Sequence, residues 1–274
     1  MLSCTDVSMI LELLRDVSVL SVISGLRRML MAFADLMLPR TCIVCGKKLL
    51  VDEILLCLNC RINLPLTHFW ERTHNPMADR FNEILQKKLE KEWVPERYAY
   101  ACALFYYDSD GEYRHITQEL KYHGNIRAGK HFGRMLGIRM KSQPHLSDIS
   151  IVIPVPLHWR RKWERGYNQA EVIAGELASV LGAEMKPELL RRIRSTRTQT
   201  KLDVKDKTEN VSGAFRAFRT EGTAAPERLT EGHIMIVDDV FTTGSTVLAC
   251  FSALREILPP TVRISIATLG FVGQ

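Results

Sequence analysis

The stretch that decides the fold is His233-Ile-Met-Ile-Val-Asp-Asp-Val-Phe-Thr-Thr-Gly-Ser-Thr246. Four apolar residues in a row, 234–237, predict a short strand that is buried on both faces. The adjacent carboxylates of Asp238 and Asp239 follow this strand, and a loop of hydroxyl residues around one glycine comes next. Helical periodicity over 247–258 then stops at two prolines. The predicted order is strand, acidic pair, loop and helix.

The loop has the composition of a phosphate site, because the start of a helix presents unpaired N–H groups and a positive dipole end. Gly244 allows close approach of the backbone, and hydroxyl donors surround it at Thr242, Thr243, Ser245 and Thr246. Carboxylates at a strand end can accept hydrogen bonds from a ribose or hold Mg²⁺ through water. A ribose 5-phosphate therefore fits the whole element. The alternative is a buried strand and an N-capped helix, with the acidic pair in a solvated turn.

Composition indicates an ordinary folded protein, and the charge is concentrated in one segment. The 274 residues are 46% hydrophobic and 25% charged, and the net charge is +6. Residues 150–220 hold 14 Lys and Arg against 8 Asp and Glu, which equals the whole excess. Such a segment indicates a phosphate compound or a nucleic acid as partner, or else a solvated basic face. Charges interrupt the apolar stretch at 1–24, so we expect a cytoplasmic protein with no signal peptide and no membrane span.

Two Cys-x-x-Cys pairs, Cys42/Cys45 and Cys57/Cys60, are separated by eleven residues. This is the spacing of a zinc ribbon, in which four thiolates hold Zn²⁺ and stabilise a module too small for its own core. A disulfide or a thioredoxin-type redox pair is disfavoured by the expected compartment and by the second pair. The other cysteines, Cys4, Cys102 and Cys250, lack such spacing, and we expect the last two to be buried.

The rest of the chain alternates strand and helix patterns, which predicts an α/β fold with a mostly parallel sheet. Strands are expected at 98–107, 149–156, 189–193 and 263–269, and helices at 26–38, 81–91, 116–121, 128–140 and 170–181. The helix at 26–38 is interpreted as packed on the neighbouring module, the alternative being a membrane-surface helix. The irregular, basic stretch at 194–215 indicates a functional lid or disorder.

A second anion site of similar design is expected after the strand at 149–156. A basic turn with His158, Arg165 and Gly166 follows that strand and precedes the helix at 170–181. The glycine again allows close approach of the backbone to a ligand. The segment Gly124–His131 resembles a Walker motif, but the required Ser or Thr is replaced by His131, so a helix explains it better.

The loop at Asp238–Thr246 resembles the phosphoribosyl-pyrophosphate (PRPP) loop of type I phosphoribosyltransferases. As a whole, residues 36–274 resemble the ComF family, phosphoribosyltransferase-like proteins with an N-terminal zinc ribbon. The motifs that carry this resemblance are the four cysteines, Leu120–Gly124, Pro154–His158 with Arg165–Gln169, Asn210–Phe215 and Asp238–Thr246.

The resemblance implies a type I phosphoribosyltransferase-like sheet flanked by helices, and transfer of a phosphoribosyl group from PRPP with Mg²⁺ and release of pyrophosphate. We expect the chain to divide into four parts: an N-terminal helical segment at 1–38, a zinc ribbon at 39–66, a helical linker at 67–94 and a phosphoribosyltransferase-like domain at 95–274. The catalytic residues would be Asp238, Asp239 and Arg165. PRPP would be bound by Asp238, Asp239 and Thr242–Thr246. His158, Arg165 and Gly166 would face the pyrophosphate, and the hood would contain Arg194, Arg197, Thr198 and Lys201.

Two functions from different classes fit these expectations. The first is a phosphoribosyltransferase whose acceptor is not a purine, because Thr242 stands where purine enzymes carry an aspartate base. The second is a single-stranded-DNA-binding accessory protein of DNA uptake, with PRPP as a regulatory ligand or its site as a relic. In that case the basic residues would follow a phosphate backbone and DNA-processing proteins would be partners. They are Arg160, Arg161, Lys162, Arg191, Arg192 and Arg194.

Overall fold

The computed structural model describes residues 38–89, 96–193, 213–218 and 231–273. The chain falls into two compact units, which divide between Asn63 and Leu64. The helix expected at 26–38 lies outside the described residues, apart from its last position. None of the helices in the described ranges is long and apolar enough to cross a membrane.

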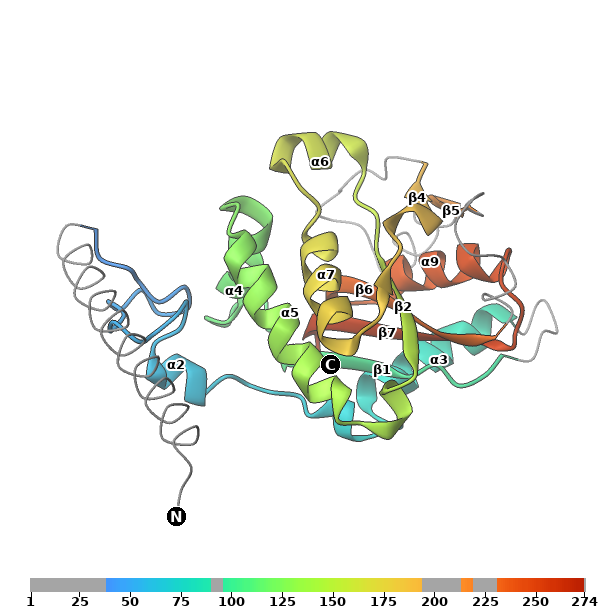
Figure 1. The fold of residues 1–274 in the computed structure, drawn as a ribbon, viewed down its shortest axis with the longest axis horizontal. Coiled ribbons are helices and arrows are strands. Elements are labelled where there is room, and N and C mark those ends of the chain that lie inside the picture. Colours follow the sequence, from blue (N-terminus) through green and yellow to red (C-terminus); the bar gives the residue numbers. More distant parts are fainter. Residues whose placement is uncertain (1–37, 90–95, 194–212, 219–230, 274) are drawn as a thin grey trace, which may run out of the picture. The chain divides into compact units, whose positions relative to one another are not determined.

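The larger unit is built on a five-stranded sheet in which every pairing is parallel, in the order β1-β7-β6-β2-β3 (Figure 1). This confirms the mostly parallel sheet predicted from the alternating pattern. The strands are β1 Ala101–Tyr106, β2 Ile149–Pro154, β3 Glu184–Met185, β6 Gly232–Phe241 and β7 Val262–Phe271. The centre of β6, residues 233–237, is buried throughout, as its apolar run predicts.

The helices of this unit are α3 Pro76–Leu89, α4 Arg114–Tyr122, α5 Ile126–Lys141, α6 Trp159–Arg165, α7 Gln169–Leu181 and α9 Ser245–Arg255. Short 3₁₀ turns lie at Phe69–Glu71, Pro144–Leu146 and Pro187–Leu189. Helix α5 packs against α7, which contacts β2 and β6, while α3 contacts α9. Because α7 and α9 make crossovers in opposite directions from neighbouring strands, right-handed connections place them on opposite faces of the sheet.

Three glycines spaced four residues apart let α5 approach α7 closely. A Cβ atom at Gly129 would lie 2.8 Å from Val172 Cγ1, and one at Gly133 would lie 2.9 Å from the carbonyl oxygen of Ile173. At Gly137 the nearest atom would be 3.0 Å away. The segment that resembles a Walker motif is therefore the start of a tightly packed helix, as the sequence interpretation favoured.

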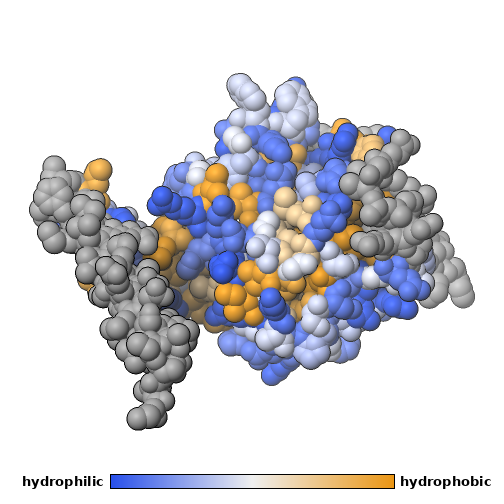
Figure 2. Space-filling model, in the orientation of Figure 1, coloured by the Kyte–Doolittle hydropathy of each residue, from blue (hydrophilic) through white to orange (hydrophobic). Residues whose placement is uncertain are grey.

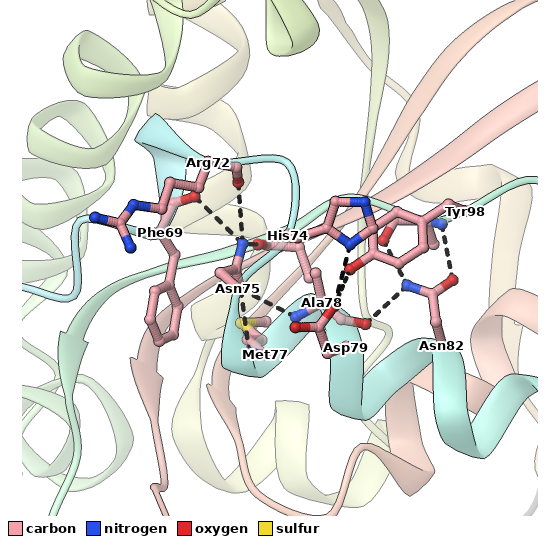
Figure 3. A network of polar contacts seen from close by, with 11 residues as sticks. Phe69, Arg72, His74, Asn75, Met77, Ala78, Asp79, Asn82 and Tyr98 are labelled. Carbon is pink, nitrogen blue, oxygen red and sulfur yellow. Dashed lines mark hydrogen bonds and ion pairs between the residues drawn. The ribbon is translucent and has the colours of Figure 1, made fainter.

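Strand β1 is an edge of the sheet, and the side chain of Asn82 in α3 pairs with the segment that leads into it as a neighbouring strand would (Figure 3). Asn82 Nδ2 donates to the carbonyl of Ala99 at 2.9 Å, and Asn82 Oδ1 accepts from the Ala99 amide at 2.9 Å. Farther along, Asn75 Nδ2 donates to the carbonyl of Ala101 at 2.9 Å. An open edge invites pairing with other chains, so these contacts protect it.

Helix α3 consequently packs as part of the larger unit. Asn75 Oδ1 accepts from the amides at the start of α3, and the helix buries Met77 and Phe81 completely. The Phe81 ring packs against that of Phe251 in α9, 5.6 Å between centroids. The segment 67–94, which the sequence interpretation treated as a linker, thus contributes core residues to the α/β unit.

A small antiparallel pair lies beside α9, made of β4 Leu190–Arg192 and β5 Phe215–Ala217. The strand expected at 189–193 is confirmed, but it pairs with β5 outside the main sheet. Most of the expected lid, residues 194–212, lies outside the described residues. Cys102 and Cys250 are buried, as expected, whereas Cys4 lies outside the described range.

Candidate functional site

The two central strands, β2 and β6, form a topological switch point. Helix α7 connects β2 with β3, whereas α9 connects β6 with β7 on the other side. Ligands of open α/β sheets bind at such a point, outside the carboxyl ends of the strands. Pro154 pairs with Val237, so β2 ends where the acidic pair begins. The topology therefore brings both predicted anion sites, 158–166 and 242–246, to the carboxyl ends of the strands.

The acidic pair lies within β6 and not after it, which corrects the expected strand end at Val237. Asp238 still pairs with Thr268 of β7, and the ladder continues to Phe241. Each carboxylate accepts from the next backbone amide, Asp238 from Asp239 at 2.8 Å and Asp239 from Val240 at 2.9 Å. Asp239 is buried, 6% exposed, while Asp238 keeps partial exposure. The ladder holds both carboxylates in fixed positions.

Lys121, the penultimate residue of α4, is the cationic partner of this pair. Its Nζ lies 2.6 Å from Asp239 Oδ2, and the two side chains are 25% and 8% exposed. Burial lowers the pKa of Lys121, but the charges of Asp239 and Asp238 outweigh burial and raise it. The lysine is therefore protonated and neutralises one carboxylate.

Asp238 responds differently to the same surroundings. Burial and then the charge of Asp239 raise the pKa of Asp238 from 3.8 to about 8, against the opposing effect of Lys121. The raised pKa favours the protonated form of Asp238, and a protonated carboxyl can donate a hydrogen bond.

The loop at 242–246 leads directly into α9. Gly244 is the N-cap with φ +79°, a left-handed conformation that favours glycine. A Cβ there would also lie 2.6 Å from Ile84 Cδ1 of α3. Thr243 Oγ1 and Ser245 Oγ are 2.9 Å apart, so these hydroxyls stand together at the helix start. This is the arrangement that the sequence predicted for a phosphate, and the fit to a ligand stays a prediction.

The expected basic turn at 158–165 is instead a short helix, α6. Its N-cap is His158, whose Nδ1 accepts from the Arg160 amide at 3.3 Å, and it ends at Gly166 with φ +76°. A Cβ at Gly166 would meet no atom within 4 Å, so the backbone conformation alone calls for glycine. The Arg165 guanidinium donates to Gln169 Oε1 at 2.9 Å and lies 5.6 Å from the ring centroid of Tyr122.

Positive charge from α6 and β4 gathers at this edge. Burial lowers the pKa of Arg192 in β4, and Arg161 and Asp238 both act on it by charge. Burial also lowers the pKa of His158, with further lowering by Arg192, Arg160 and Arg161. Arg192 is therefore acted on by charges from both α6 and the acidic pair. The hood residues Arg194, Arg197, Thr198 and Lys201 lie outside the described residues.

The smaller unit carries the cysteine cluster. The Sγ atoms of Cys42, Cys45, Cys57 and Cys60 all lie within 4.8 Å of one another, and those of Cys45 and Cys57 are 3.7 Å apart. Tetrahedral Zn²⁺ with Zn–S bonds of about 2.3 Å places its sulfur ligands roughly 3.8 Å apart, so the four thiols fit a zinc ion. In the described part of the chain this is the one such cluster of potential metal ligands.

The backbone around these cysteines forms the expected knuckle. Gly46 adopts φ +73°, and its amide donates to the Cys42 carbonyl at 2.8 Å. Burial opposes ionisation of Cys42, but backbone N–H donors, led by Cys45 and Cys57, lower its pKa to about 7. Burial and the neighbouring thiols raise the pKa of Cys60, so ionisation in the cluster begins at Cys42. Glu53 closes the loop between the pairs by accepting from the Leu58 amide at 2.6 Å.

Several known proteins share sequence with this chain, although no family model matches it. Competence protein F of Haemophilus influenzae is 29% identical over 145 residues, 52% of this chain and 61% of that protein. DNA utilization protein YhgH of Salmonella typhi is 39% identical over 114 residues, 41% of this chain and 46% of that protein. YhgH of Escherichia coli O157:H7 is 29% identical over 227 residues, 81% and 87% respectively. The chain is a homologue of competence protein F and YhgH.

These relatives confirm the resemblance to the ComF family. The chain spans about half of the Salmonella YhgH length and three-fifths of competence protein F, but most of the Escherichia coli YhgH length. Sequence reasoning gave no role to Lys121 within the motif Leu120–Gly124. In the structure this lysine forms an ion pair with Asp239. The position of Lys121 in that motif could have indicated a role. The neighbouring sequence does not identify Asp239 as its partner.

Proposed function

We propose that this chain is an accessory protein of DNA uptake or utilisation that binds single-stranded DNA through basic residues at the carboxyl edge of its sheet. The names of its relatives, competence protein F and DNA utilization protein, support a DNA-related role. The observation that carries the proposal is α6, which has no buried residue and a basic outer surface. Arg160 and Lys162 are exposed, and Arg161 is partly exposed. Arg191 of β4 is exposed as well.

Binding to the phosphate backbone predicts a strong dependence on salt. If three basic residues of α6 contact phosphates, the logarithm of affinity falls with the logarithm of salt concentration at a slope of about −2. Reversing them together, Arg160→Glu, Arg161→Glu and Lys162→Glu, should weaken binding of a fluorescent dT oligonucleotide at least about tenfold and flatten that slope. Fluorescence anisotropy at two salt concentrations measures both quantities.

The matched control reverses three exposed charges on α5: Lys130→Glu, Arg134→Glu and Lys141→Glu. It has the same net charge as the α6 variant, so it isolates position from total charge. The proposal expects this control to retain the wild-type slope. An equal loss of affinity in both variants would show that DNA is attracted by total charge and not by α6, which would refute the proposed site. An absence of DNA binding by the wild type would refute the proposal as a whole.

A second ligand is proposed for the acidic pair and the loop at 242–246, namely PRPP with Mg²⁺. The supporting observation is that a carboxylate pair within the last part of β6, a left-handed Gly244 and clustered hydroxyls meet at the switch point. In this proposal the larger unit is of the type I phosphoribosyltransferase kind, and the cysteine cluster holds structural zinc. Asp238 and Asp239 would contact the ribose, and Thr242–Thr246 the 5-phosphate.

Calorimetric titration of PRPP with Mg²⁺ tests this second ligand. We expect wild type to bind and Asp239→Ala not to bind, because the substitution removes one ribose acceptor and leaves the Lys121 ammonium without its partner. No binding by folded, zinc-loaded wild type would contradict the PRPP site. Pyrophosphate release that depends on an added acceptor would support group transfer, whereas binding without release would support a regulatory ligand.

A further inference from the structure

Two tryptophans stand on the outer surface of α6. Trp159 is 67% exposed and Trp163 is 85% exposed. In Figure 1 α6 projects away from the sheet, and in Figure 2 the projecting region is white to blue with little orange. Tryptophan carries a large apolar ring system, and a folded protein that leaves two of them in water on one short helix uses them for binding.

The spacing of these rings suits an unpaired strand. Residues four apart lie on the same face of a helix, about 6 Å apart along its axis. Stacked nucleotides of a duplex strand advance about 3.4 Å each, which is less than the rise between these two positions of the helix. A single strand can stretch to this distance and place one base on each ring.

A basic residue is next to each tryptophan in the sequence. The Arg160 guanidinium lies 5.2 Å from the Trp159 ring centroid, and Lys162 precedes Trp163. At the end of the helix, the Arg165 guanidinium lies 5.6 Å from the ring of Tyr122, which is itself 72% exposed. Aromatic rings alternating with cations are how proteins hold single strands, because rings take the bases and cations take the phosphates.

Both ends of α6 are fixed to the larger unit, so the helix is presented as a defined surface. Beyond Gly166, the Tyr167 hydroxyl donates to the carbonyl of Leu120. Asn168 Nδ2 donates to the carbonyl of Val155 at 3.0 Å, and Asn168 Oδ1 caps α7 by accepting from the Ala170 amide at 3.1 Å. Lys162 Nζ lies 3.0 Å from Glu171 of α7.

We propose that Trp159 and Trp163 form a stacking platform on which two bases of single-stranded DNA rest, one on each indole. The proposal rests on the DNA-binding function above and specifies how that site distinguishes single strands from duplex. In a duplex the faces of the bases are covered by neighbouring base pairs, so no base is free to stack on the indoles. Since every base has a π face, binding is independent of base identity.

Substitutions that separate stacking from charge test the platform. Trp163→Leu and Trp159→Leu should each weaken dT binding about tenfold, within the range for loss of one stacked base, with an unchanged salt slope. Trp163→Phe, which keeps an aromatic face, should stay within about threefold of wild type. Because α6 buries none of its residues, all these variants should keep the wild-type melting temperature.

Intrinsic fluorescence gives a second readout. We expect dT to quench tryptophan emission in wild type, and the quench to disappear in the double variant Trp159→Phe with Trp163→Phe. Trp70, which is only 3% exposed, and Trp93 stay in both proteins, so their emission is the background that the double variant measures. Wild-type affinity in the leucine variants, with salt-dependent binding intact, would overturn the platform while the DNA-binding proposal stands. Equal affinity of wild type for duplex and single strands would overturn it as well.

Failure of the wild type to bind any DNA would instead refute the underlying function. If the leucine variants lose binding to a protein partner but not to dT, the platform for bases is overturned and α6 is a protein-docking surface.

Discussion

At the scale of single residues, the contact between Lys121 and Asp239 determines the charge of the candidate site. The ammonium lies 2.6 Å from a carboxylate that is 8% exposed, so removal of the lysine leaves a buried charge without its partner. We expect Lys121→Met to lower the free energy of unfolding by about 3 kcal/mol. Urea denaturation at pH 8 measures this loss.

Lys162→Met is the control for Lys121→Met. Lys162 pairs with Glu171, and these side chains are 49% and 32% exposed, so the same substitution should change stability by less than about 1 kcal/mol. Equal effects of the two substitutions would show that the buried pair contributes no more than a surface pair.

His233 gives the unfolding free energy a pH dependence. Its Nδ1 lies 2.6 Å from Asp148 Oδ1 and its Nε2 lies 2.6 Å from Ser265 Oγ, while Arg263 and His145 act on it by charge. Burial lowers the pKa of His233 from 6.5, although Asp148 opposes this. The unfolded chain therefore takes up the proton first as pH falls.

The stability that depends on neutral His233 is complete above pH 6.5 and is lost as pH falls through the folded pKa. Urea denaturation at pH 7.5, 6.5 and 5.5 should show decreasing stability in wild type and a smaller decrease in His233→Gln. The same slope in both proteins would contradict the assignment. The Asp148, His233 and Ser265 chain resembles a catalytic triad in its connections, but Ser265 is fully buried.

At the scale of elements, the close contact between α5 and α7 depends on glycine. A Cβ at Gly133 would lie 2.9 Å from a backbone carbonyl, which cannot move without shifting α7. Gly133→Ala should therefore destabilise the protein by about 1–3 kcal/mol despite the better helix propensity of alanine. Thermal unfolding measures the effect.

Gly175→Ala in α7 is the matched control for Gly133→Ala. The nearest atom to its Cβ would be Met185 Sδ at 3.8 Å, an ordinary contact. This substitution should be neutral or stabilise the protein by up to about 1 kcal/mol. A stabilising Gly133→Ala would mean that the two helices can separate at little cost.

The elements also show what the sequence could predict. Apolar runs and helical periodicity predicted β2, β6, β7, α5 and α7, because each has a strong local pattern. Helix α6 was expected as a turn, since Trp159–Arg165 has no apolar stripe and buries nothing. Strand β6 was expected to end at Val237, but pairing with Thr268 and Gly270 of β7 extends it through the acidic pair. Such pairings are not local and leave no periodic signal.

At the scale of the whole molecule, alternating patterns predicted a parallel sheet but not its strand order. The order places β6 beside β2. The motifs at 158–166 and 242–246, which are far apart in the sequence, therefore lie at the carboxyl ends of neighbouring strands. The cysteine cluster needed no long-range information, because its ligand spacing lies within residues 42–60. Lys121 meets Asp239 only through the fold, which is why its role was missed.

Removal of zinc should affect the two units unequally. Within residues 38–63, the described part of the cysteine unit, the buried apolar residues apart from the cysteines are Val44 and Leu56, whereas the α/β unit has its own core. A strong chelator should release about one zinc per chain and abolish the structure around residues 42–60, because structural zinc supplies folding free energy to such modules. The main thermal transition should persist.

Zinc analysis with calorimetry before and after chelation measures these effects, and Cys57→Ser with Cys60→Ser should mimic the chelator. Loss of the main transition on chelation would show that the α/β unit depends on the metal. A wild-type preparation that holds no zinc in a reducing buffer would contradict the assignment of the site.

The most direct test of the proposed DNA site is photo-cross-linking. A single strand containing 5-iodouracil is bound, irradiated and digested, and the cross-linked peptides are identified by mass spectrometry. We predict cross-links at Trp159 and Trp163 of α6, which salt abolishes together with binding. Cross-links confined to other parts of the chain, with none on α6, would contradict the central claim that this helix receives the single strand.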